Sequence, residues 1–431
     1  MKINVKITMA LLALGIVAQA SADNVVYLTG STAFRSTVYN ALHTVGDVFD
    51  ATNPVISEVE FGGSSASGAN YMLFHGTIGG TPTYIDCAWS GSEAGIASAC
   101  GATLKNVDRN GSQINLAGSP ETWLLADGSV TMNGYNSTNP AAAELEASSH
   151  IADIAQADTS QAVSLTPRVI STSTDLKDYG VEGVVTFTWV KNINTSPTSD
   201  WTDLVNLTLP QVDVLLGRGY EYPALFTGNN TETNRYVYLV GRNKGSGTRA
   251  NTLVDHNYGP TTKSVVQFSI GYGIEEAAIA NDLVLTNENN NGYESGGGVA
   301  TALGINGSCQ QTDPFFGKSG WFAVGYLGCS DALSHGLAVS PNWLTLDGVG
   351  ESSGAIEEGQ YYFWGHEHLY GRNGISGYQD TDAQVIYNGI KTSLGTSGSV
   401  AANHDAAINL VYMHCDKASD VAYPVRNAGF N

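Results

Sequence analysis

The sequence predicts an α/β protein built of more than one lobe. Short β-rich runs alternate with helical stretches through much of the chain, which is typical of an α/β architecture. The chain has 431 residues, of which 42% are hydrophobic and 50 are glycine. This length exceeds what one hydrophobic core usually organises. We therefore expect a loop-rich globular protein with at least two lobes.

The N-terminal residues 1–22 have the three parts of a secretory signal peptide. Lys2 and Lys6 precede an apolar run at residues 7–18, and the small residues 20–22 form a cleavage site. The apolar run is too short to cross a membrane, which takes about 20 residues, and no later stretch is long and apolar enough. Asp23, rather than a lipidated cysteine, follows the cleavage site. We expect a periplasmic or extracellular protein without a lipid anchor.

The charge balance excludes some partners. The chain has 19 Lys+Arg and 40 Asp+Glu, a formal net charge of −21. Such a surface repels nucleic acids and anionic membranes, which are bound mainly through basic patches. A small anion would have to be held by local hydrogen bonds and dipoles. We expect no nucleic-acid partner, no cofactor, no metal and a monomeric state.

The five cysteines favour disulfides over metal ligands, because disulfides persist in exported proteins. The pairs closest along the chain are Cys87 with Cys100 and Cys309 with Cys329, and we expect these two bridges. Closing a loop of about 14 residues would contribute about 3 kcal/mol. Cys415 is left over.

The first elements follow a strand, turn, helix order. Residues 25–28 form an apolar run of strand length, a polar turn follows, and residues 34–42 have a helical pattern. Residues 71–74 and 83–85 flank Gly79-Gly80-Thr81-Pro82 and predict a hairpin. Residues 105–145 are rich in Asn, Gly, Ser and Thr, which predicts an insertion or a long surface loop.

Later elements repeat this order. Residues 183–190 predict a buried strand. Thr208 and Pro210 mark the start of a helix. Residues 236–240 predict a strand that leads into a glycine-rich turn, with a helix starting at Thr248.

That glycine-rich turn, residues 245–249, is the first candidate anion site. Its glycines let the backbone approach a ligand, and the N–H groups at a helix N-terminus point toward an anion. Ser246 and Thr248 add hydroxyl donors, and the Arg242 guanidinium suits two oxygens of one anion. The alternative is an ordinary helix cap.

Two weaker candidates precede it. Residues 30–34, Gly-Ser-Thr-Ala-Phe, also follow a strand and open a helix, so their N–H groups could face an anion. Residues 153–158 form a strand-like run that ends on Asp158. Taken alone, both are more readily explained as a capped helix and a turn residue.

Taken in order, these segments resemble the phosphate-binding proteins of phosphate ABC importers, a family of type II periplasmic binding proteins. The family has a Thr-Gly turn after its first strand, two aspartates separated as Asp153 and Asp158 are, and an Arg followed by Gly-Ser-Gly-Thr as at Arg242 and residues 245–248. The resemblance spans most of residues 25–330. It implies mixed sheets, a hinge and a cleft between two lobes, with residues 23–185 and 327–431 in one lobe and 186–326 in the other.

The resemblance implies phosphate or a similar oxyanion as ligand, an ABC permease as the partner of a transport protein, and no enzymatic activity. Carried over by position, the ligand-binding residues are Ser31, Thr32, Ala33, Phe34, Ser90, Ser92, Asp158, Arg242, Ser246, Gly247 and Thr248. Asp158 would accept a proton from the ligand. The family's Gly-Ser-Ser-Gly serine corresponds to Ser64 or Ser65 by sequence and to Ser90 or Ser92 by context, and we favour the latter. The chain departs from the family at Ala33, where the family has threonine, and at Lys244, where it has an acidic residue.

Two other functions compete with anion binding. His366-Glu367-His368 and His404-Asp405 could supply a hydrolase with metal ligands or an acid/base pair, but neither a Gly-x-Ser-x-Gly elbow nor a His-Glu-x-x-His helix is present. The acidity, the Asn/Gly-rich loops and the missing lipid anchor would also suit an extracellular structural or adhesive protein that keeps the same fold.

Overall fold

The computed structural model shows a mixed α/β fold. It describes residues 23–52, 56–101, 105–107, 113–115, 122–147, 150–161, 164, 176–229, 233–259, 263–272, 283–289, 291–305, 313, 315–318, 320–396, 404–405, 407–417 and 424–426. The predicted signal peptide, residues 1–22, lies outside them. The predicted α/β class with mixed sheets is confirmed, since parallel and antiparallel strand pairs share one sheet.

The first half of the molecule contains the sheet order β9-β17-β8-β1-β4-β3-β2-β7. In it β1 is parallel to both β4 and β8, and β17 is antiparallel to β8. Its strands are β1 (Asn24–Gly30), β2 (Ser57–Phe61), β3 (Tyr71–Ile78), β4 (Thr81–Ala88), β7 (Gly134–Asn136), β8 (Ile154–Ala157) and β17 (Trp364–Gly371).

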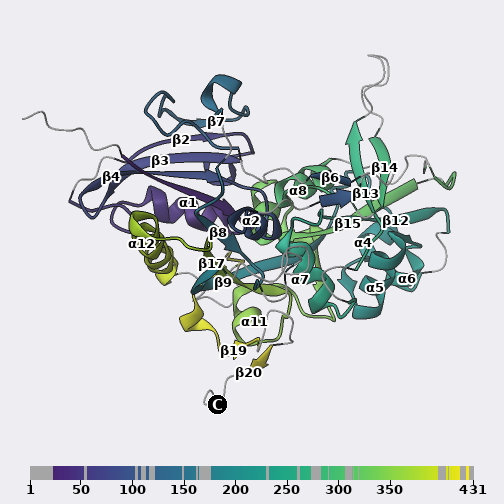
Figure 1. The fold of residues 1–431 in the computed structure, drawn as a ribbon. Helices are drawn as coiled ribbons and strands as arrows, with labels where there is room; N and C mark the ends of the chain where they lie inside the picture. Colours follow the sequence, from purple (N-terminus) through teal and green to yellow (C-terminus); the bar gives the residue numbers. More distant parts are fainter. Residues whose placement is uncertain are drawn as a thin grey trace, which may run out of the picture.

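The second half contains the order β14-β13-β12-β15-β9. Its strands are β12 (Arg235–Val240), β13 (Gln267–Tyr272), β14 (Leu283–Asn289) and β15 (Gly320–Gly328), with the short β10 (Asn206–Leu207), β11 (Tyr220–Glu221) and β16 (Trp343–Leu346). Figure 1 shows β1–β4 and β12–β15 on opposite sides of the molecule.

One long strand, β9 (Lys177–Lys191), joins the two halves. From Lys177 to Thr186 it pairs with β17, and from Phe187 to Lys191 it pairs with β15. The division of the chain at residues 185 and 326 stays a prediction. β16, in the segment predicted for the first lobe, pairs with β10 and with the second-half part of β9.

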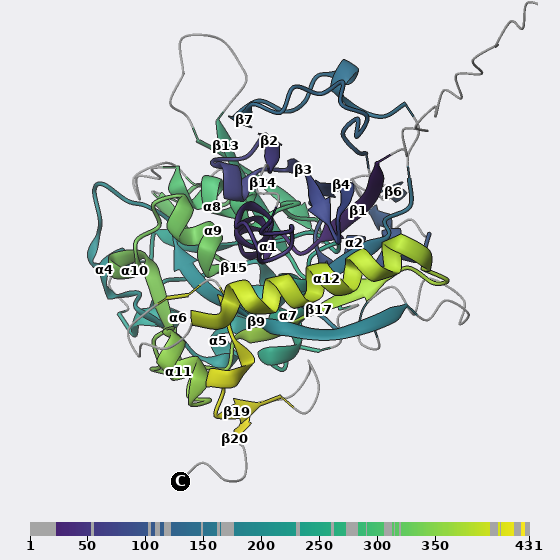
Figure 2. The ribbon, with the colours of Figure 1, turned by 90° about the vertical axis from the view of Figure 1, so that its left-hand side faces the viewer.

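Helices cover these sheets. Figure 2 shows the long α12 lying across β9 and β17. The helices are α1 (Arg35–His43), α2 (Ser92–Ala99), α4 (Ser199–Asp203), α5 (Leu209–Arg218), α6 (Ala224–Thr227), α7 (Gly247–Asp255), α8 (Gly296–Gly304), α9 (Cys329–Ser334), α10 (Val339–Asn342), α11 (Ser353–Glu357) and α12 (Gly377–Ser393). Short 3₁₀ helices are η1 (Ala66–Gly68), η2 (Ala142–Glu144), η3 (Leu394–Thr396) and η4 (Leu410–Tyr412), and the remaining strands are β5 (Lys105–Val107), β6 (Gln113–Asn115), β18 (Ala407–Ile408), β19 (Cys415–Asp416) and β20 (Val425–Arg426).

The local signals placed several elements correctly. β3 and β4 form the predicted hairpin, in which Ile78 lies opposite Thr81. Its two-residue turn, Gly79-Gly80, has positive φ at both positions, a conformation for which hairpin turns favour glycine, asparagine and aspartate. Thr208 caps α5, and its N–H donates to Gln211 Oε1 at 2.8 Å.

The described part of the glycine- and asparagine-rich segment packs against the sheet. Its residues 122–147 contribute Leu124 and Val130 to a small core with Val59 and Phe61 of β2. Its strand β7 extends the sheet beside β2. The polar composition of residues 105–145 gave no sign of these apolar side chains, which cover one face of the β3–β4 hairpin.

The predicted disulfide between Cys87 and Cys100 is wrong. Cys87 is a free thiol that packs within the main core under β4, whereas Cys100 follows α2 and packs with a different cluster. Cys329 is also a free thiol, buried where β15 ends, and its predicted partner Cys309 lies outside the described residues. Cys87 and Cys100 are close along the chain, but a bridge requires close approach of their Cβ atoms, which closeness in sequence does not ensure.

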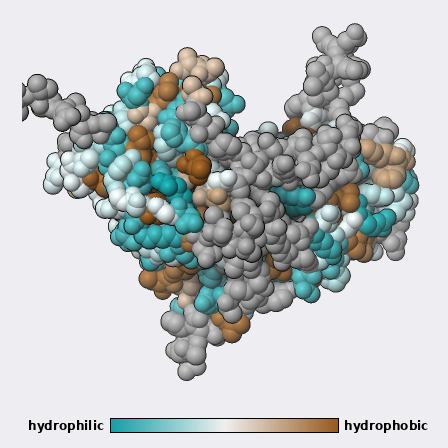
Figure 3. Space-filling view, in the orientation of Figure 1, coloured by the Kyte–Doolittle hydropathy of each residue, from teal (hydrophilic) through white to brown (hydrophobic). Residues whose placement is uncertain are grey.

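The surface in Figure 3 shows hydrophilic and hydrophobic residues interspersed over the first half. Among the described residues, no helix has the length and apolar character needed to cross a membrane.

Candidate functional site

The predicted ligand residues gather at one edge of the sheet. Because β1 is parallel to β4 and β8, their carboxyl ends lie together, which is where α/β sheets bind ligands. Ser31 and Asp158 directly follow β1 and β8, while Ser90 lies two residues after β4 and Arg242 two residues after β12 in the second half. All eleven predicted residues are buried, none more than 4% exposed among those with a value.

Hydrogen bonds link the predicted residues across the two halves. Arg242 Nη2 donates to Thr32 Oγ1 at 3.2 Å. The Asp158 backbone N–H donates to Ser92 Oγ at 3.3 Å, and the Asp158 carbonyl accepts from Asn251 Nδ2 at 2.9 Å. The three sequence segments chosen as candidates therefore meet in space.

Arg242 is fixed by its backbone. Its N–H donates to the Tyr326 hydroxyl at 3.2 Å, and its carbonyl accepts from Arg249 Nη1 at 3.1 Å and Gln267 Nε2 at 2.9 Å. These contacts fix the backbone from which the buried Arg242 side chain extends.

The Arg242 side chain is 1% exposed and incompletely bonded. Beyond Thr32, its Nη2 also donates to the Glu294 carbonyl at 2.9 Å. Within the described part of the chain, its Nε and Nη1 have no hydrogen-bond partner. Burial lowers the pKa of Arg242, while the carboxylates of Asp331 and Asp158 act in the opposite direction. The arrangement is a buried cation with N–H groups left to donate.

The N-terminus of α7 faces the same place. Ser246 is its N-cap, with Oγ accepting from Arg249 N–H at 3.1 Å. A Cβ atom on Gly247 would lie 1.4 Å from Asp158 Oδ1, so only glycine permits the Asp158 carboxylate to stand against the first turn of α7. The partial positive charge of a helix N-terminus favours a carboxylate or another anion there.

The N-terminus of α2 is used differently. The Glu93 and Ala94 N–H groups donate to the Gly245 carbonyl at 3.0 and 3.3 Å. Gly91, with φ of +100°, allows this approach, since a Cβ there would lie 2.5 Å from the Gly245 oxygen. A carbonyl of the second half therefore occupies donors that a ligand could otherwise have taken.

Other predicted residues have structural contacts. Phe34 lies in the main core, and the Ala33 carbonyl accepts from Ser330 Oγ at 3.3 Å. Of the two serine alternatives, Ser64 is exposed and Ser65 caps η1 by accepting from Gly68 N–H. The buried pair Ser90 and Ser92 lies with the other predicted residues: Ser90 Oγ is 3.1 Å from Thr29 Oγ1, and Ser92 contacts Asp158.

Sequence reasoning missed an ion pair between the two halves. Arg35, at the start of α1, bonds Asp331 of α9 at 3.3 Å, with both side chains 5% exposed. A Cβ on Gly296 would lie 2.0 Å from Asp331 Oδ2, so this carboxylate also stands at the N-terminus of α8. The sequence signal for this site is the run Gly296-Gly297-Gly298 at the start of α8, which gives no indication of the partner.

Sequence reasoning also missed a buried carboxyl group, Glu367 of β17. It is 0% exposed, and burial raises its pKa well above the ordinary value, with Asp158 and then Glu182 adding to the rise. A glutamate in the otherwise apolar and aromatic run 361–370 was the available signal. The sequence analysis assigned Glu367 to the candidate hydrolase motif His366-Glu367-His368 and not to the anion site.

The hydrolase interpretation gains no geometric support. Along β17 the rings of His366 and His368 lie on one side, in contact with each other, whereas Glu367 interacts with Asp158. His404 pairs with Glu351, while Asp405 accepts from Ser353 Oγ at 2.9 Å. The described residues include no group of three or more His, Cys, Asp or Glu that could hold a metal.

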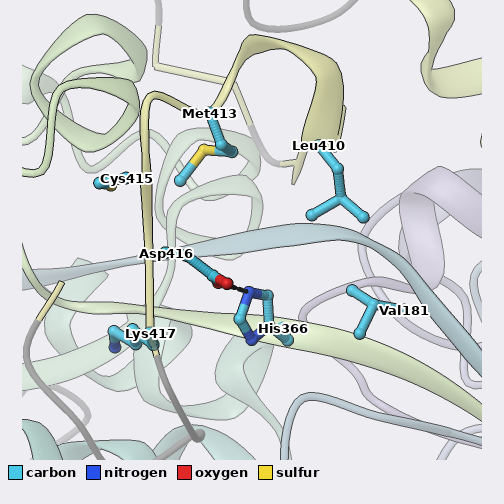
Figure 4. A pocket seen from close by; sticks show the side chains of 7 residues that line it. All are labelled: Val181, His366, Leu410, Met413, Cys415, Asp416 and Lys417. Atoms are coloured by element: carbon cyan, nitrogen blue, oxygen red, sulfur yellow. Dashed lines mark ion pairs between the residues drawn. The ribbon is translucent and has the colours of Figure 1, made fainter. Parts of the chain in front are cut away.

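His366 instead lines a separate cavity of about 330 Å³ (Figure 4). Its Nε2 lies 3.2 Å from Asp416 Oδ1. The walls come from β9, β17 and the C-terminal segment: Val181, His366, Leu410, Met413, Cys415, Asp416 and Lys417. None of the predicted ligand residues lines this cavity.

Comparison with known proteins gave structures alone. No family model and no curated protein sequence matches the chain. A structure described as a phosphate ABC transporter substrate-binding protein with bound phosphate, from Clostridium perfringens, is 13% identical with a TM-score of 0.43, covering 90% of this chain and 100% of that one. The PstS protein of Borrelia burgdorferi is 12% identical with a TM-score of 0.34, covering 87% and 96%, and an ABC-type phosphate transport receptor from Vibrio cholerae is 14% identical with a TM-score of 0.31, covering 55% and 74%.

Proposed function

We propose that this protein is a solute-binding protein, not an enzyme, that holds phosphate or a similar oxyanion between its two halves. One observation carries the proposal: Arg242 is buried, and its Nε and Nη1 have no partner in the described part of the chain. Leaving a buried charged donor unsatisfied costs free energy. An oxyanion would supply both the missing acceptors and the missing charge.

The surrounding groups suit an anion. The N-terminus of α7 adds a favourable dipole beside Arg242. Thr32 and Ser92 place hydroxyl groups on the first-half side of the site. A ligand contacted from both halves would favour the state in which the halves are together.

A structural or adhesive protein is the second candidate, and one observation favours it. The Gly245 carbonyl already accepts from two N–H groups of α2, so part of the first-half site is closed by the chain itself. In that case the two halves would stay together without a ligand, and an added anion would not change the stability.

The experiment is thermal unfolding of the mature protein with inorganic phosphate, sulfate or neither. Binding to the folded state stabilises by mass action, by about 2.7 kcal/mol at a ligand concentration 100 times the Kd. We expect a rise in Tm with phosphate for the wild type and no rise for Arg242→Ala, which loses charge-assisted hydrogen bonds. If neither phosphate nor sulfate changes the Tm of the wild type, the proposal is wrong.

Arg218→Ala is the matched control. It removes the same charge from Arg218, an exposed residue at the end of α5 that pairs with Glu221 of β11, so it should keep the full phosphate shift. A chelator added to the same samples tests the metallohydrolase alternative, which requires that removing a metal lowers the Tm.

A further inference from the structure

Glu367 stands beside the proposed site without a completed set of contacts. In the register of β17 with β8, Leu369 lies opposite Gln156 and His368 opposite Ala157. Extended by one residue, this register puts Glu367 beside Asp158. Within the described residues, neither carboxyl oxygen of Glu367 has a hydrogen-bond partner. A buried carboxyl group in this state is unexplained by packing alone.

Three elements face this carboxyl group. Asp158 approaches from the end of β8, Glu182 from β9, and the Ser31 hydroxyl from the turn after β1. Glu182 is the extra residue of a β-bulge, because Val181 pairs with His368 and Gly183 pairs with Glu367. The two negative neighbours oppose ionisation of Glu367, and the Ser31 hydroxyl favours it.

The next charged groups belong to the neighbours. Gln156, His368 and Lys391 face Glu182 and favour its ionised form, although burial keeps the pKa of Glu182 well above its ordinary value. Arg242 interacts with Asp158 from the second half. The cations of this region thus act on Glu182 and Asp158, and Glu367 is left facing carboxyl groups and one hydroxyl.

Ser31 is the group that connects Glu367 to the site. It is 1% exposed, and its Oγ has no hydrogen-bond partner in the described part of the chain, so it faces Glu367 without yet forming a bond in the required geometry. Its own N–H donates to the Gln156 carbonyl at 2.9 Å, which fixes its position next to Thr32. A hydroxyl carries one proton and can point it in only one direction at a time.

We propose that Glu367 is a positioning residue of the oxyanion site, and that the protonation state of its carboxyl group decides whether Ser31 donates a hydrogen bond to the bound anion. This inference rests on the function proposed above. A neutral Glu367 donates a hydrogen bond to Ser31 Oγ, and the Ser31 O–H then points to a ligand oxygen. An ionised Glu367 accepts a hydrogen bond from the Ser31 O–H, which turns a lone pair toward the anion, and it adds a negative charge beside the anion.

The test is the Kd for inorganic phosphate, measured calorimetrically from pH 5 to 9 on wild type and Glu367→Gln. Glutamine stays neutral and can still donate to Ser31, so both proteins should bind alike at acidic pH. Above the pKa of Glu367 the wild type should weaken relative to the variant, by up to about tenfold per pH unit. The ratio of the two Kd values cancels the ionisation of phosphate itself.

Two further variants sharpen the result. Ser31→Ala should weaken binding at acidic pH by about tenfold, the ratio expected for one hydrogen bond to a charged group, and it should reduce the excess loss at alkaline pH to the part that comes from the negative charge of Glu367. Glu182→Gln is the matched control, a buried carboxyl group changed in the same way but facing Gln156, and it should retain that alkaline loss. If the wild type binds phosphate and its Kd ratio to Glu367→Gln is constant with pH, the inference is wrong; if the wild type does not bind phosphate at any pH, the proposed function itself fails.

Discussion

Two buried cations of this molecule differ in how completely they are bonded. Lys417, in the C-terminal segment, lies 2.8 and 2.9 Å from the two carboxylate oxygens of Asp255 at the end of α7, and it also donates to the Trp364 carbonyl. Arg242, just before the other end of α7, has no ion pair with a carboxylate in the described part of the chain and keeps Nε and Nη1 without partners. Both side chains are almost fully buried.

The difference separates a structural charge from one prepared for a ligand. A buried charge is tolerated when a fixed opposite charge and hydrogen bonds replace water. The fold supplies both to Lys417 and only part of them to Arg242. Asp255 lies at the C-terminal end of α7 and Arg242 precedes its N-terminal end, so the dipole of α7 disfavours the charge of each side chain. The helix alone therefore explains neither position.

Breaking the completed pair should give the largest effect. Lys417→Ala leaves the Asp255 carboxylate buried without its cation, and removing one partner of a buried pair costs about 3–5 kcal/mol of unfolding free energy. Urea unfolding measures this. Lys417→Met combined with Asp255→Leu should recover much of the loss. Arg242→Ala should cost clearly less in phosphate-free buffer, and an equal loss would remove the distinction between the two cations.

Acid should lower the stability of the folded protein through His256, which lies near the ion pair of Lys417 and Asp255. Burial lowers the pKa of His256 to about 3, and nearby Lys417 lowers it too. The neutral ring is satisfied on both sides, with Nε2 accepting from Trp189 and Nδ1 facing the Thr252 carbonyl.

Because the unfolded state takes up the proton near pH 6.5, His256 should contribute stability above that pH. This contribution should be lost as pH falls toward 3, by at most about 1.4 kcal/mol per pH unit. Comparing urea unfolding of wild type and His256→Gln isolates this slope. If the unfolding free energies of the two proteins change in parallel between pH 4 and 7, the pKa of His256 is not lowered in the folded state.

The smallest effect concerns anion choice at the incomplete cation. Phosphate carries a proton near neutral pH and sulfate does not, so the Asp158 carboxylate can accept a hydrogen bond only from phosphate. Asp158→Asn can donate instead, and the phosphate-to-sulfate affinity ratio should fall by about tenfold, roughly 1.4 kcal/mol. Titrating both anions into both proteins measures the ratio. A ratio that does not fall excludes Asp158 as the selectivity element.

Sequence reasoning succeeded where a feature is local. The turns at Ser31, Ser90 and Ser246 were predicted because each strand, turn and helix follow one another in the chain. The structure gathers the turns at Ser31 and Ser90 because β1 and β4 are parallel, whereas Ser246 follows β12 in the second half. Their roles in binding stay predictions.

Sequence reasoning failed where two distant segments determine the outcome. Glu367 lies beside Asp158 only through the register of β17 with β8, which no local pattern of His366-Glu367-His368 reveals. The Cys87–Cys100 bridge failed for the same reason, because the packing of β4 and α2 directs the two thiols into different clusters. The partner of Arg35 was hidden likewise in α9.

The shared strand β9 has a consequence for how the chain is completed during synthesis. Every strand that pairs with β9 in the described part of the chain comes later in the sequence: β15, β16, β17 and β18. A chain still being made therefore carries an apolar strand with both edges open until these partners emerge. Pairings between distant segments form slowly, and open edges are where unfinished chains aggregate. Neither half can close its sheet alone, so premature truncation after β14 would leave a product that lacks every neighbour of its central strand.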